Sequence, residues 1–505
     1  VFYGGSQAGN AGEAKNVGKT RFLNKRKQCK YAIGNKVITI RNRSEEERRR
    51  RMGSLAKRIA AQRELFDGGR TKPLAFRLAM LGRLETLIRE QEDAVLAALR
   101  LDLSKSRAEA YMTELALVYG ELREARRNLR VWAGTERVRG SLASFPAKNY
   151  VYREPYGVVL ILAPWNYPFY LSIAPLIAAI AAGNCAIVKC SAESVHTSAL
   201  IRKLLRSVFP ASFVYCTAPD MDHEELLRQR YDYIFFTGSP RVGKLIMRAA
   251  SEHLTPVTLE LGGKSPCIVD ESADIKLAAR RIVWGKFLNA GQTCIAVDYV
   301  LVQRRVKAAL VQALSAEIER RYPKAEQRES YPKIINRRHY ERLLGLIAAE
   351  KEVIGGARNE RAEKIAPTLF PEAEFDHACM GEEIFGPLLP IITYDELETA
   401  IGEIKAREKP LACYVFTRDK RKAEMLIRKL SFGGGCVNDV LLQIGNHRLP
   451  FGGVGNSGMG AYHGRYGFET FSHKKAVVKN TGFPDLPFRY APFDEGKLKL
   501  LKKFL

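Results

Sequence analysis

Short apolar runs recur along the middle of the chain. They span Val158–Leu162, Cys185–Val188, Phe213–Tyr215, Tyr233–Phe236 and Val257–Leu259. Each run has the length of a strand, and its lack of polar alternation indicates burial on both faces. We expect helices between these strands, at Ser172–Ala182, Ser194–Phe209, Glu224–Arg230 and Val242–Ser251. Repeated strand–helix units predict a parallel sheet covered on both sides, which is a doubly wound α/β architecture suited to nucleotides.

The flanking segments extend this pattern. From Met52 to about Trp132 the apolar spacing is helical, and residues 136–156 are strand-like and rich in turn residues, which predicts a hairpin. A second α/β unit is expected after residue 260. Its predicted helices are Ile275–Leu288, Val306–Arg321, Asp395–Ala406 and Lys420–Leu430, and its predicted strands are Tyr299–Gln303, Leu388–Ile392 and Ala412–Phe416. After Ser431 the chain is rich in glycine and is expected to be loop-like.

The positive charge is concentrated at the N-terminus. The formal net charge is +26, and residues 1–51 hold 14 Lys/Arg against 4 Asp/Glu. These residues lack helical periodicity, so we expect a disordered extension outside the native fold, followed by a helix that starts at Met52 with Ser54 as its N-cap. A basic arm for nucleic acid or anionic lipid is the alternative interpretation. The other 454 residues carry 67 Lys/Arg against 51 Asp/Glu; this diffuse excess predicts no nucleic-acid partner.

Composition and breakers argue for a globular protein that does not enter a membrane. Hydrophobic residues make up 46% of the chain and charged residues 27%. The uncharged stretch 155–188 is long enough to span a bilayer, but four prolines and Gly183 interrupt it, so we expect a buried core. Nine dispersed cysteines indicate a reducing compartment, here the cytoplasm, rather than a disulfide scaffold.

Two segments that follow predicted strands carry candidate binding residues. Gly238, Ser239 and Gly243 lie where a strand passes into a helix, and helix-start N–H groups favour phosphate. The spacing is not that of a dinucleotide fingerprint or a phosphate-binding loop, so a plain strand-to-helix turn remains the alternative. Asn166 lies between two prolines after a strand, where its amide can stabilise an oxyanion or brace the turn.

Three further segments carry candidate chemistry. Cys294 lies between a helix and a strand and is either a reactive thiol or an inert buried one. Glu260, between two leucines, is either a base with a raised pKa or a partner of a nearby cation. Glu383 and Phe385 would share one face of an extended stretch that holds a ribose and a flat ring, or else form a solvated acid and a core aromatic. No metal site is expected.

Taken together, these motifs resemble those of the aldehyde dehydrogenase superfamily, in particular its class 3 branch of fatty and aromatic aldehyde dehydrogenases. The resemblance runs from Met52 to about Leu505. It rests on Gly68–Pro73, Ala163–Pro168, Val257–Pro266, Gly291–Cys294, Glu382–Pro387 and Leu449–Gly460.

The resemblance implies an aldehyde dehydrogenase-like fold with two doubly wound α/β domains and a small bridging element. The implied division is a dinucleotide-binding domain at 52–260 with a bridging hairpin at 136–156, a catalytic thiol domain at 261–440, and a C-terminal loop and bridging segment at 441–505. Class 3 relatives are dimers, so a homodimer bridged by the hairpin and a strand near Ala476–Lys479 is expected by analogy.

The resemblance also assigns roles. Cys294 matches the nucleophile that attacks the aldehyde, Asn166 matches the donor to the oxyanion, and Glu260 matches the base that activates water. Medium- or long-chain aliphatic or aromatic aldehydes would become acids through a thioester. An acyl-transferring or reductive variant is the alternative, and a structural protein that has kept the fold is a remoter one.

The resemblance places the cofactor, NAD or NADP, on six residues. Glu383 and Phe385 match residues at the nicotinamide ribose and ring, Lys189 matches one at the adenosine ribose, and Gly238, Ser239 and Gly243 match the turn near the pyrophosphate. The chain departs from the branch at Ala192, where an acid normally pairs with the ribose hydroxyls, and at Pro240-Arg241, which adds a charge. Both departures make NADP use plausible, with Glu193 as a possible substitute for the missing acid.

Overall fold

The computed structural model describes residues 40–141, 144–480, 482–485 and 489–504. Contacts divide the chain into Val1–Leu55 and Ala56–Leu505. Helix α1 (Ile40–Asp67) contains both Met52 and Ser54, so the prediction of a helix start at Met52 and of disorder up to residue 51 is wrong for residues 40–51. Glutamate and arginine at 45–51 have high helix propensity, which outweighs the missing apolar periodicity. Residues 1–39 lie outside the described residues, and their predicted disorder stays a prediction.

The first large sheet has the strand order β16-β7-β6-β3-β4-β5. Its parallel strands are β3 (Val158–Leu162), β4 (Cys185–Lys189), β5 (Val214–Cys216), β6 (Tyr233–Thr237) and β7 (Val257–Glu260). All residues of β3, β4 and β6 are buried, as the apolar runs predicted. The order reverses between β3 and β6, so a ligand site is expected where these two strands end.

Helices pack on this sheet as the sequence predicted. Those that precede the sheet strands or join them are α2 (Leu74–Glu90), α3 (Glu92–Leu103), α4 (Arg107–Ala110), η1 (Tyr111–Leu115), α5 (Ala116–Trp132), α6 (Tyr170–Ala182), α7 (Val195–Val208), α8 (His223–Leu227) and α9 (Pro240–Ser251). Every residue of α6 is buried, which confirms that the uncharged stretch is core. In the described part of the chain, we find no helix with the length and apolar character needed to cross a membrane.

The second large sheet is parallel throughout, with the order β12-β13-β9-β8-β14-β15. Its strands are β8 (Pro266–Val269), β9 (Tyr299–Gln303), β12 (Thr368–Phe370), β13 (Leu388–Tyr394), β14 (Ala412–Phe416) and β15 (Gly434–Val437). The accompanying helices are α10 (Ile275–Phe287), η3 (Leu288–Gly291), α11 (Arg304–Arg321), η4 (Ala325–Gln327), α12 (Arg337–Ala349), α13 (Ala378–Gly381), α14 (Leu397–Lys405) and α15 (Lys420–Lys429), and β10 (Arg358–Asn359) pairs with β11 (Lys364–Ile365). The sheets confirm the predicted fold, whereas the proposed domain boundaries stay a prediction.

The chain after Ser431 is more regular than predicted. It contains β15, η5 (Leu442–Gly445), β16 (Gly458–Met459), α16 (Gly464–Thr470), β17 (Ser472–Lys479) and α17 (Glu495–Phe504). The expectation of a loop-like segment is therefore wrong, whereas the strand expected near Ala476–Lys479 is present within β17. Strand β16 pairs with β7, and β17 pairs with β2 (Lys148–Pro155). These strands are held by pairing with segments that are distant in the sequence. Such strands need no local apolar pattern, so a glycine-rich stretch gives no sign of them.

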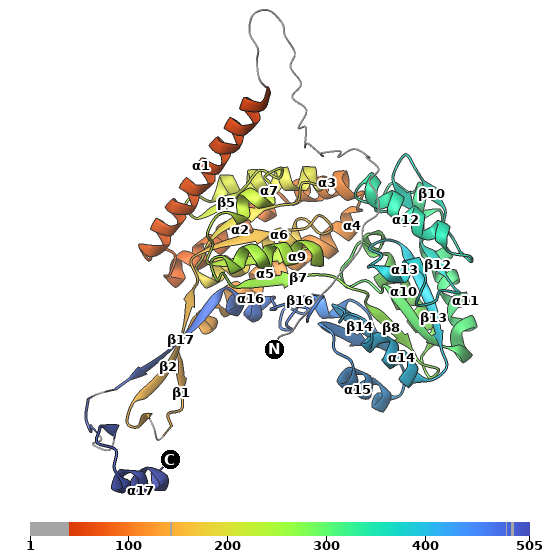
Figure 1. The fold of residues 1–505 in the computed structure, drawn as a ribbon. Coiled ribbons are helices and arrows are strands. Elements are labelled where there is room, and N and C mark those ends of the chain that lie inside the picture. The colour runs from red at the N-terminus through yellow and green to blue at the C-terminus, as the bar shows by residue number, and fades with distance from the viewer. Residues whose placement is uncertain (1–39, 142–143, 481, 486–488, 505) are drawn as a thin grey trace, which may run out of the picture. The chain divides into compact units, whose positions relative to one another are not determined.

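The predicted hairpin at 136–156 is present. Strands β1 (Glu136–Val138) and β2 are antiparallel, and β17 adds a third antiparallel strand on the other edge of β2 (Figure 1). All of β1 and most of β17 are exposed.

Candidate active site

The loop before Cys294 has an unusual backbone. Asn289, Ala290 and Gly291 all have positive φ, at 52°, 51° and 74°. A Cβ added at Gly291 would lie 2.1 Å from the carbonyl oxygen of Gly386, so only glycine fits there. Consecutive left-handed residues are costly and persist only where the surrounding structure holds them, as it often does at functional sites.

Exposure distinguishes Cys294 from most other cysteines. Among the eight cysteines in the described residues, all of which are free, six are buried, and only Cys294 and Cys436 are partly exposed. Cys294 therefore differs from the fully buried core cysteines. This result favours the reactive interpretation of Cys294 over that of an inert core residue.

Asn166 joins the end of β3 to the cysteine loop. Its side-chain Nδ2 donates a hydrogen bond to the carbonyl of Gln292 at 3.1 Å, and Asn289 Nδ2 donates to the Asn166 carbonyl at 2.9 Å. The side chain is buried. Because the amide carries two N–H bonds and this contact uses one, a second donor remains for a ligand oxygen. Asn166 is thus tied to the loop that carries Cys294.

The electrostatics around Cys294 favour a protonated thiol in the free protein. Burial raises the pKa of the Cys294 thiol, and the carboxyl groups of Glu383 and Glu260 raise that pKa further. The backbone N–H groups of Cys294 and Ile295 act in the opposite direction because they hydrogen-bond to the sulfur. A base must therefore remove the thiol proton when the nucleophile forms.

Glu260, the last residue of β7, meets the expectation of a buried carboxyl group with a raised pKa. Its exposed fraction is 2%, and neither carboxylate oxygen has a hydrogen-bond partner among the described residues. Burial raises its pKa well above the ordinary value. The alternative of a glutamate paired with a nearby cation is therefore wrong. An unpaired carboxyl group in an apolar setting is a candidate general base.

Glu383 and Phe385 lie on a loop between α13 and β13. A Cβ added at Gly262 would be 2.1 Å from Glu383 Oε2, so the carboxyl group packs against the Gly262 backbone. Burial raises the pKa of Glu383 to about 8, and Asp298 adds to the shift. Phe385 has φ 49°, so the predicted extended stretch is not maintained there. Its ring instead meets the Trp165 ring edge-on, with centroids 5.3 Å apart.

The turn between β6 and α9 has the features of a phosphate site. A Cβ on Gly238 would lie 2.4 Å from the Phe236 ring, and one on Gly243 would lie 3.0 Å from Leu261. The Ser239 hydroxyl makes no capping hydrogen bond to the start of α9. Thr237 Oγ1 at the end of β6 is buried without a partner. These unused polar groups at a helix start fit a dinucleotide pyrophosphate.

Lys189 is the final residue of β4. Its side chain is buried, and Nζ donates to the Cys190 carbonyl at 3.4 Å. Burial lowers the pKa of Lys189, so a ligand hydroxyl or phosphate nearby would favour its charged form. Ala192 and Glu193 follow on the exposed surface, and Glu193 Oε2 accepts a hydrogen bond from Asn336 at 2.9 Å. The Glu193 carboxyl group already has this partner.

Sequence reasoning missed the residues that hold the two loops together. Gln292 donates to the carbonyls of Asn289 and Lys333 at 3.1 and 3.0 Å and accepts from Ile335 N–H at 3.0 Å. The Tyr167 hydroxyl lies 2.5 Å from Thr293 Oγ1. Gln292 and Tyr167 lie within the motifs Gly291–Cys294 and Ala163–Pro168, but the neighbouring sequence does not indicate their hydrogen-bond partners. A buried pair, Lys105 and Glu114, also contacts the Asn166 loop.

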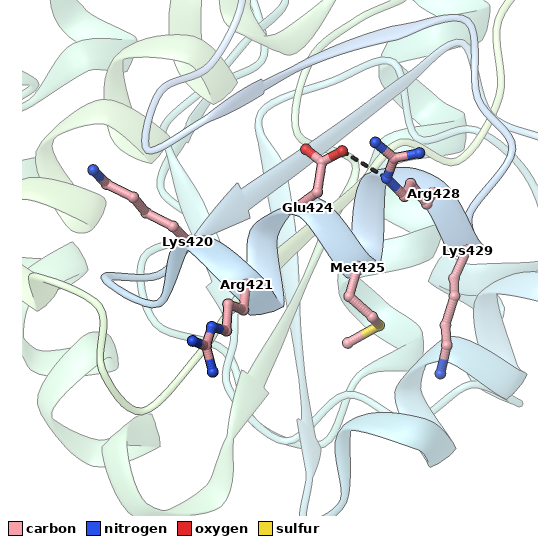
Figure 2. A pocket seen from close by; sticks show the side chains of 6 residues that line it. All are labelled: Lys420, Arg421, Glu424, Met425, Arg428 and Lys429. Atoms are coloured by element: carbon pink, nitrogen blue, oxygen red, sulfur yellow. Dashed lines mark ion pairs between the residues drawn. The ribbon is translucent and has the colours of Figure 1, made fainter.

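A separate surface depression lies along α15. Its lining residues all belong to this one helix: Lys420, Arg421, Glu424, Met425, Arg428 and Lys429 (Figure 2). Glu424 and Arg428 form an ion pair at 2.7 Å, drawn in Figure 2. None of the predicted site residues lines this depression, so it belongs to the surface and not to the site around Cys294.

Comparison with known proteins agrees with the geometry. Residues 41–477 match the aldehyde dehydrogenase family. The chain is 43% identical to 4,4'-diaponeurosporen-aldehyde dehydrogenase of Staphylococcus aureus, over 90% of this chain and 99% of that protein. It is 42% identical to aldehyde dehydrogenase family 3 member H1 of Arabidopsis thaliana, over 88% of this chain and 93% of that protein. Family 3 relatives confirm the class 3 resemblance.

Solved structures agree as well. The substrate-bound state of Staphylococcus aureus AldH superposes with a TM-score of 0.86 at 43% identity, covering 89% of this chain and 99% of that one. An NAD-dependent aldehyde dehydrogenase from Sinorhizobium meliloti gives 0.77 at 30% identity, covering 86% and 89%. Sequence motifs, sheet order and these likenesses lead to the same conclusion: the chain belongs to the aldehyde dehydrogenase family.

Proposed function

We propose that this NAD(P)-dependent aldehyde dehydrogenase oxidises medium- or long-chain aliphatic or aromatic aldehydes through a thioester on Cys294. The observation that carries the proposal is the meeting of three groups. Cys294 is a partly exposed residue, and Asn166 donates a hydrogen bond to the carbonyl of Gln292, two residues before it. Glu260 has no hydrogen-bond partner among the described residues and raises the pKa of the Cys294 thiol. Nucleophile, oxyanion donor and base are the parts that acyl chemistry requires.

Acylation begins when the Cys294 thiol loses its proton to solvent water and Sγ bonds to the aldehyde carbon. The negative charge then moves to the carbonyl oxygen. The second N–H of the Asn166 amide and the backbone N–H of Cys294 are the donors for that oxygen. Fixed donors stabilise the charge without reorganising, and losing one typically costs about 10²–10³ in rate. The bound nicotinamide supplies the acceptor for the hydride of the former aldehyde carbon.

Deacylation requires Glu260 in its ionised form. After its proton has passed to solvent, the carboxylate takes a proton from water while the water oxygen attacks the thioester carbon. The carbon–sulfur bond breaks, the acid leaves, and Cys294 returns as a thiol. Because burial raises the pKa of Glu260, its basicity is stronger than that of an ordinary carboxylate. Such a base argues against the alternative in which the acyl group passes to coenzyme A.

The cofactor would lie along the ends of β4 and β6. Lys189 would hold the adenosine ribose, Gly238, Ser239 and Gly243 the pyrophosphate, and Glu383 with Phe385 the nicotinamide ribose and ring. The hydrogen bond from Asn336 to Glu193 supports the view that Glu193 does not replace the acid missing at Ala192. NADP is therefore expected to be used as well as NAD. Comparing kcat/KM for the two cofactors in the wild type and in Ala192→Glu tests this; equal and strong NAD preference in both would refute it.

Homodimer formation and a cytoplasmic location complete the proposal. The outer strands β1 and β17 expose residues along a three-stranded antiparallel sheet, and an exposed strand edge is a template for pairing with another chain. Eight free thiols among the described residues suit a reducing compartment. Light scattering on the purified protein should give twice the chain mass; the mass of a monomer would contradict the dimer.

One assay tests the activity. Nicotinamide absorbance is followed with hexanal, decanal and benzaldehyde, with NAD and NADP, for the wild type and Cys294→Ala. We expect acid formation by the wild type and loss of it in the variant. Adding coenzyme A should leave the product unchanged, and an acyl-coenzyme A product would establish the alternative instead.

A further inference from the structure

A fully buried ion pair lies beside the site, and the mechanism above leaves it without a role. Lys105 Nζ and Glu114 Oε1 are 2.7 Å apart, and both side chains have an exposed fraction of 0%. Lys105 directly precedes the helix formed by α4, η1 and α5, and Glu114 lies within it. Both residues are more than fifty positions away from Asn166 in the sequence.

The ammonium group of Lys105 contacts Glu114 and the Asn166 loop. Besides Glu114, Nζ donates to the backbone carbonyl of Asn166 at 3.2 Å. The ammonium group also lies 4.1 Å from the centre of the Tyr167 ring. The Tyr167 hydroxyl in turn meets Thr293, the residue next to Cys294.

Glu114 fixes the other end of the same loop. Its Oε2 accepts hydrogen bonds from the backbone N–H groups of Phe169 and Tyr170, at 2.8 and 3.2 Å. These N–H groups stand at the start of α6, where a carboxylate is favoured by the helix dipole. The Asn166 loop is thus held by Lys105 at its middle and by Glu114 where it enters α6.

The helix is locally altered where Glu114 stands. Residues Tyr111–Leu115 form a single turn of π-helix, which is rare and often occurs at functional sites. Glu109, five residues before Glu114, accepts a hydrogen bond from the backbone N–H of Asn289 at 2.7 Å. An α-helix would direct residues five apart to different faces, whereas i→i+5 bonding brings them closer to the same one. One helix therefore anchors both the Asn166 loop and the Cys294 loop.

Stability alone does not account for such a pair. Replacing a buried ion pair by apolar residues of similar size is often neutral or stabilising, because desolvation offsets the attraction. What apolar residues cannot supply is a fixed donor and a fixed acceptor for three backbone groups of one loop. The distinctive contribution of the pair is therefore the position of that loop.

We propose that Lys105 and Glu114 are positioning residues that set the Asn166 amide against the aldehyde oxygen during acylation. The proposal rests on the proposed function, in which Asn166 donates to the oxyanion. Positional errors of about 1 Å can cost on the order of 10² in rate. Without the pair, the Asn166 amide would still be present, but the position of its loop would be less well defined.

The test is single-turnover kinetics with enzyme in excess over aldehyde and saturating NAD, followed by NADH fluorescence. Asn166→Ala should slow acylation by about 10²–10³-fold. Lys105→Met should slow it by about 10- to 100-fold, while the NADH dissociation constant and the aldehyde KM change less than about twofold. The double variant Asn166→Ala/Lys105→Met should be no slower than Asn166→Ala alone, because Lys105 acts through Asn166.

Two further variants separate positioning from folding. Glu114→Gln keeps the side-chain volume and one acceptor oxygen but loses the charge, and it should also slow acylation. This variant takes the place of Lys105→Met if Lys105→Met does not fold. Lys364→Met is the control, since Lys364 is also a buried lysine and donates to the carbonyls of Arg328 and Glu329 at 2.6 and 3.1 Å. It should lower the unfolding temperature without slowing acylation.

The outcomes are distinguishable. Unchanged acylation in Asn166→Ala would overturn the proposed oxyanion role itself. Slow acylation in Asn166→Ala with normal rates in Lys105→Met or Glu114→Gln would overturn the positioning proposal alone. So would a double variant whose loss equals the product of the single losses, or a Lys364→Met variant as slow as Lys105→Met.

Discussion

Replacing Glu383 by glutamine should stabilise the cofactor-free protein at neutral pH while weakening cofactor binding. The surroundings of Glu383 raise its pKa from 4.5 to about 8, mainly through burial. Between these two values the unfolded chain ionises at this position while the folded protein keeps the proton. Wild-type stability therefore falls as the pH rises from about 4.5 to about 8, and Glu383→Gln lacks that loss.

The size of the effect follows from the shift. At pH 7, which lies about 2.5 units above the pKa of 4.5 in the unfolded chain, ionisation of this group lowers the free energy of the unfolded state. At about 1.4 kcal/mol per unit, the free energy of unfolding falls by about 3.4 kcal/mol. Since the side chain is partly exposed, we halve this to about 2 kcal/mol. The folded unit Ala56–Leu505 has 450 residues, and at about 2.1 cal/mol/K per residue an unfolding free energy of this size corresponds to about 2 °C.

Scanning calorimetry of the cofactor-free enzyme at pH 5 and pH 8 measures this. The variant should unfold about 2 °C above the wild type at pH 8 and within about 0.5 °C of it at pH 5. The exposed neighbour Glu382 is the control, since its carboxylate pairs with Arg342 at 3.0 Å on the surface. Glu382→Gln should give no gain that grows with pH. An equal gain in both variants, or no gain in Glu383→Gln, would refute the reasoning.

The same variant tests the assigned role of Glu383. Because the folded protein keeps the Glu383 proton at neutral pH, the hydrogen bond to the nicotinamide ribose is one between neutral groups, which contributes about 0.5–1.5 kcal/mol. Losing it should raise the KM for cofactor by roughly two- to tenfold. A more stable variant with an unchanged cofactor KM would contradict the ribose contact and leave the burial argument intact.

Three further predictions concern the chemistry and the loop that holds the nucleophile. Glu260→Gln should keep a burst of about one NADH per site and lose about 10²–10⁴ in steady-state rate, because the general base is gone; an unchanged steady-state rate would show that another group activates water. Raising the pH should speed deacylation in the wild type, because Glu260 must ionise from a raised pKa, and should not do so in Glu260→Gln, as multiple-turnover stopped flow can record. Gly291→Ala should fold poorly or lose acylation, because its Cβ would lie 2.1 Å from the Gly386 carbonyl oxygen. Gly345→Ala in α12 should be stable and active, because a Cβ there meets no atom within 4 Å. Equal behaviour of the two variants would contradict the packing argument.

Much of the fold could be predicted because burial leaves a signature in the sequence. The runs that became β3, β4 and β6 are apolar throughout and fully buried. Strand β15 shows why other elements escaped: a Cβ at Gly435 would lie 2.0 Å from the Cys413 carbonyl, so the strand requires the residue that elsewhere signals a loop. Residues 40–51 of helix α1 escaped for the opposite reason, since helix propensity acts there without an apolar stripe.

The candidate site divides in a similar way. Cys294, Glu260 and Asn166 could be named because their motifs are local and resemble those of a family. The network that holds them could not, since Lys105, Glu114 and Gln292 act on backbone groups far away in sequence. The type of a side chain determines whether it can donate or accept a hydrogen bond, whereas its partner depends on the folded structure.

A direct measurement of the acyl group decides the central claim. Glu260→Gln is mixed with aldehyde and cofactor, quenched within the burst phase, and digested for mass spectrometry. The account predicts the acyl mass on the peptide that contains Cys294, at close to one group per NADH formed, and no acid from Cys294→Ala. NADH release with an unmodified Cys294, or acid formation at the wild-type rate by the alanine variant, would contradict it.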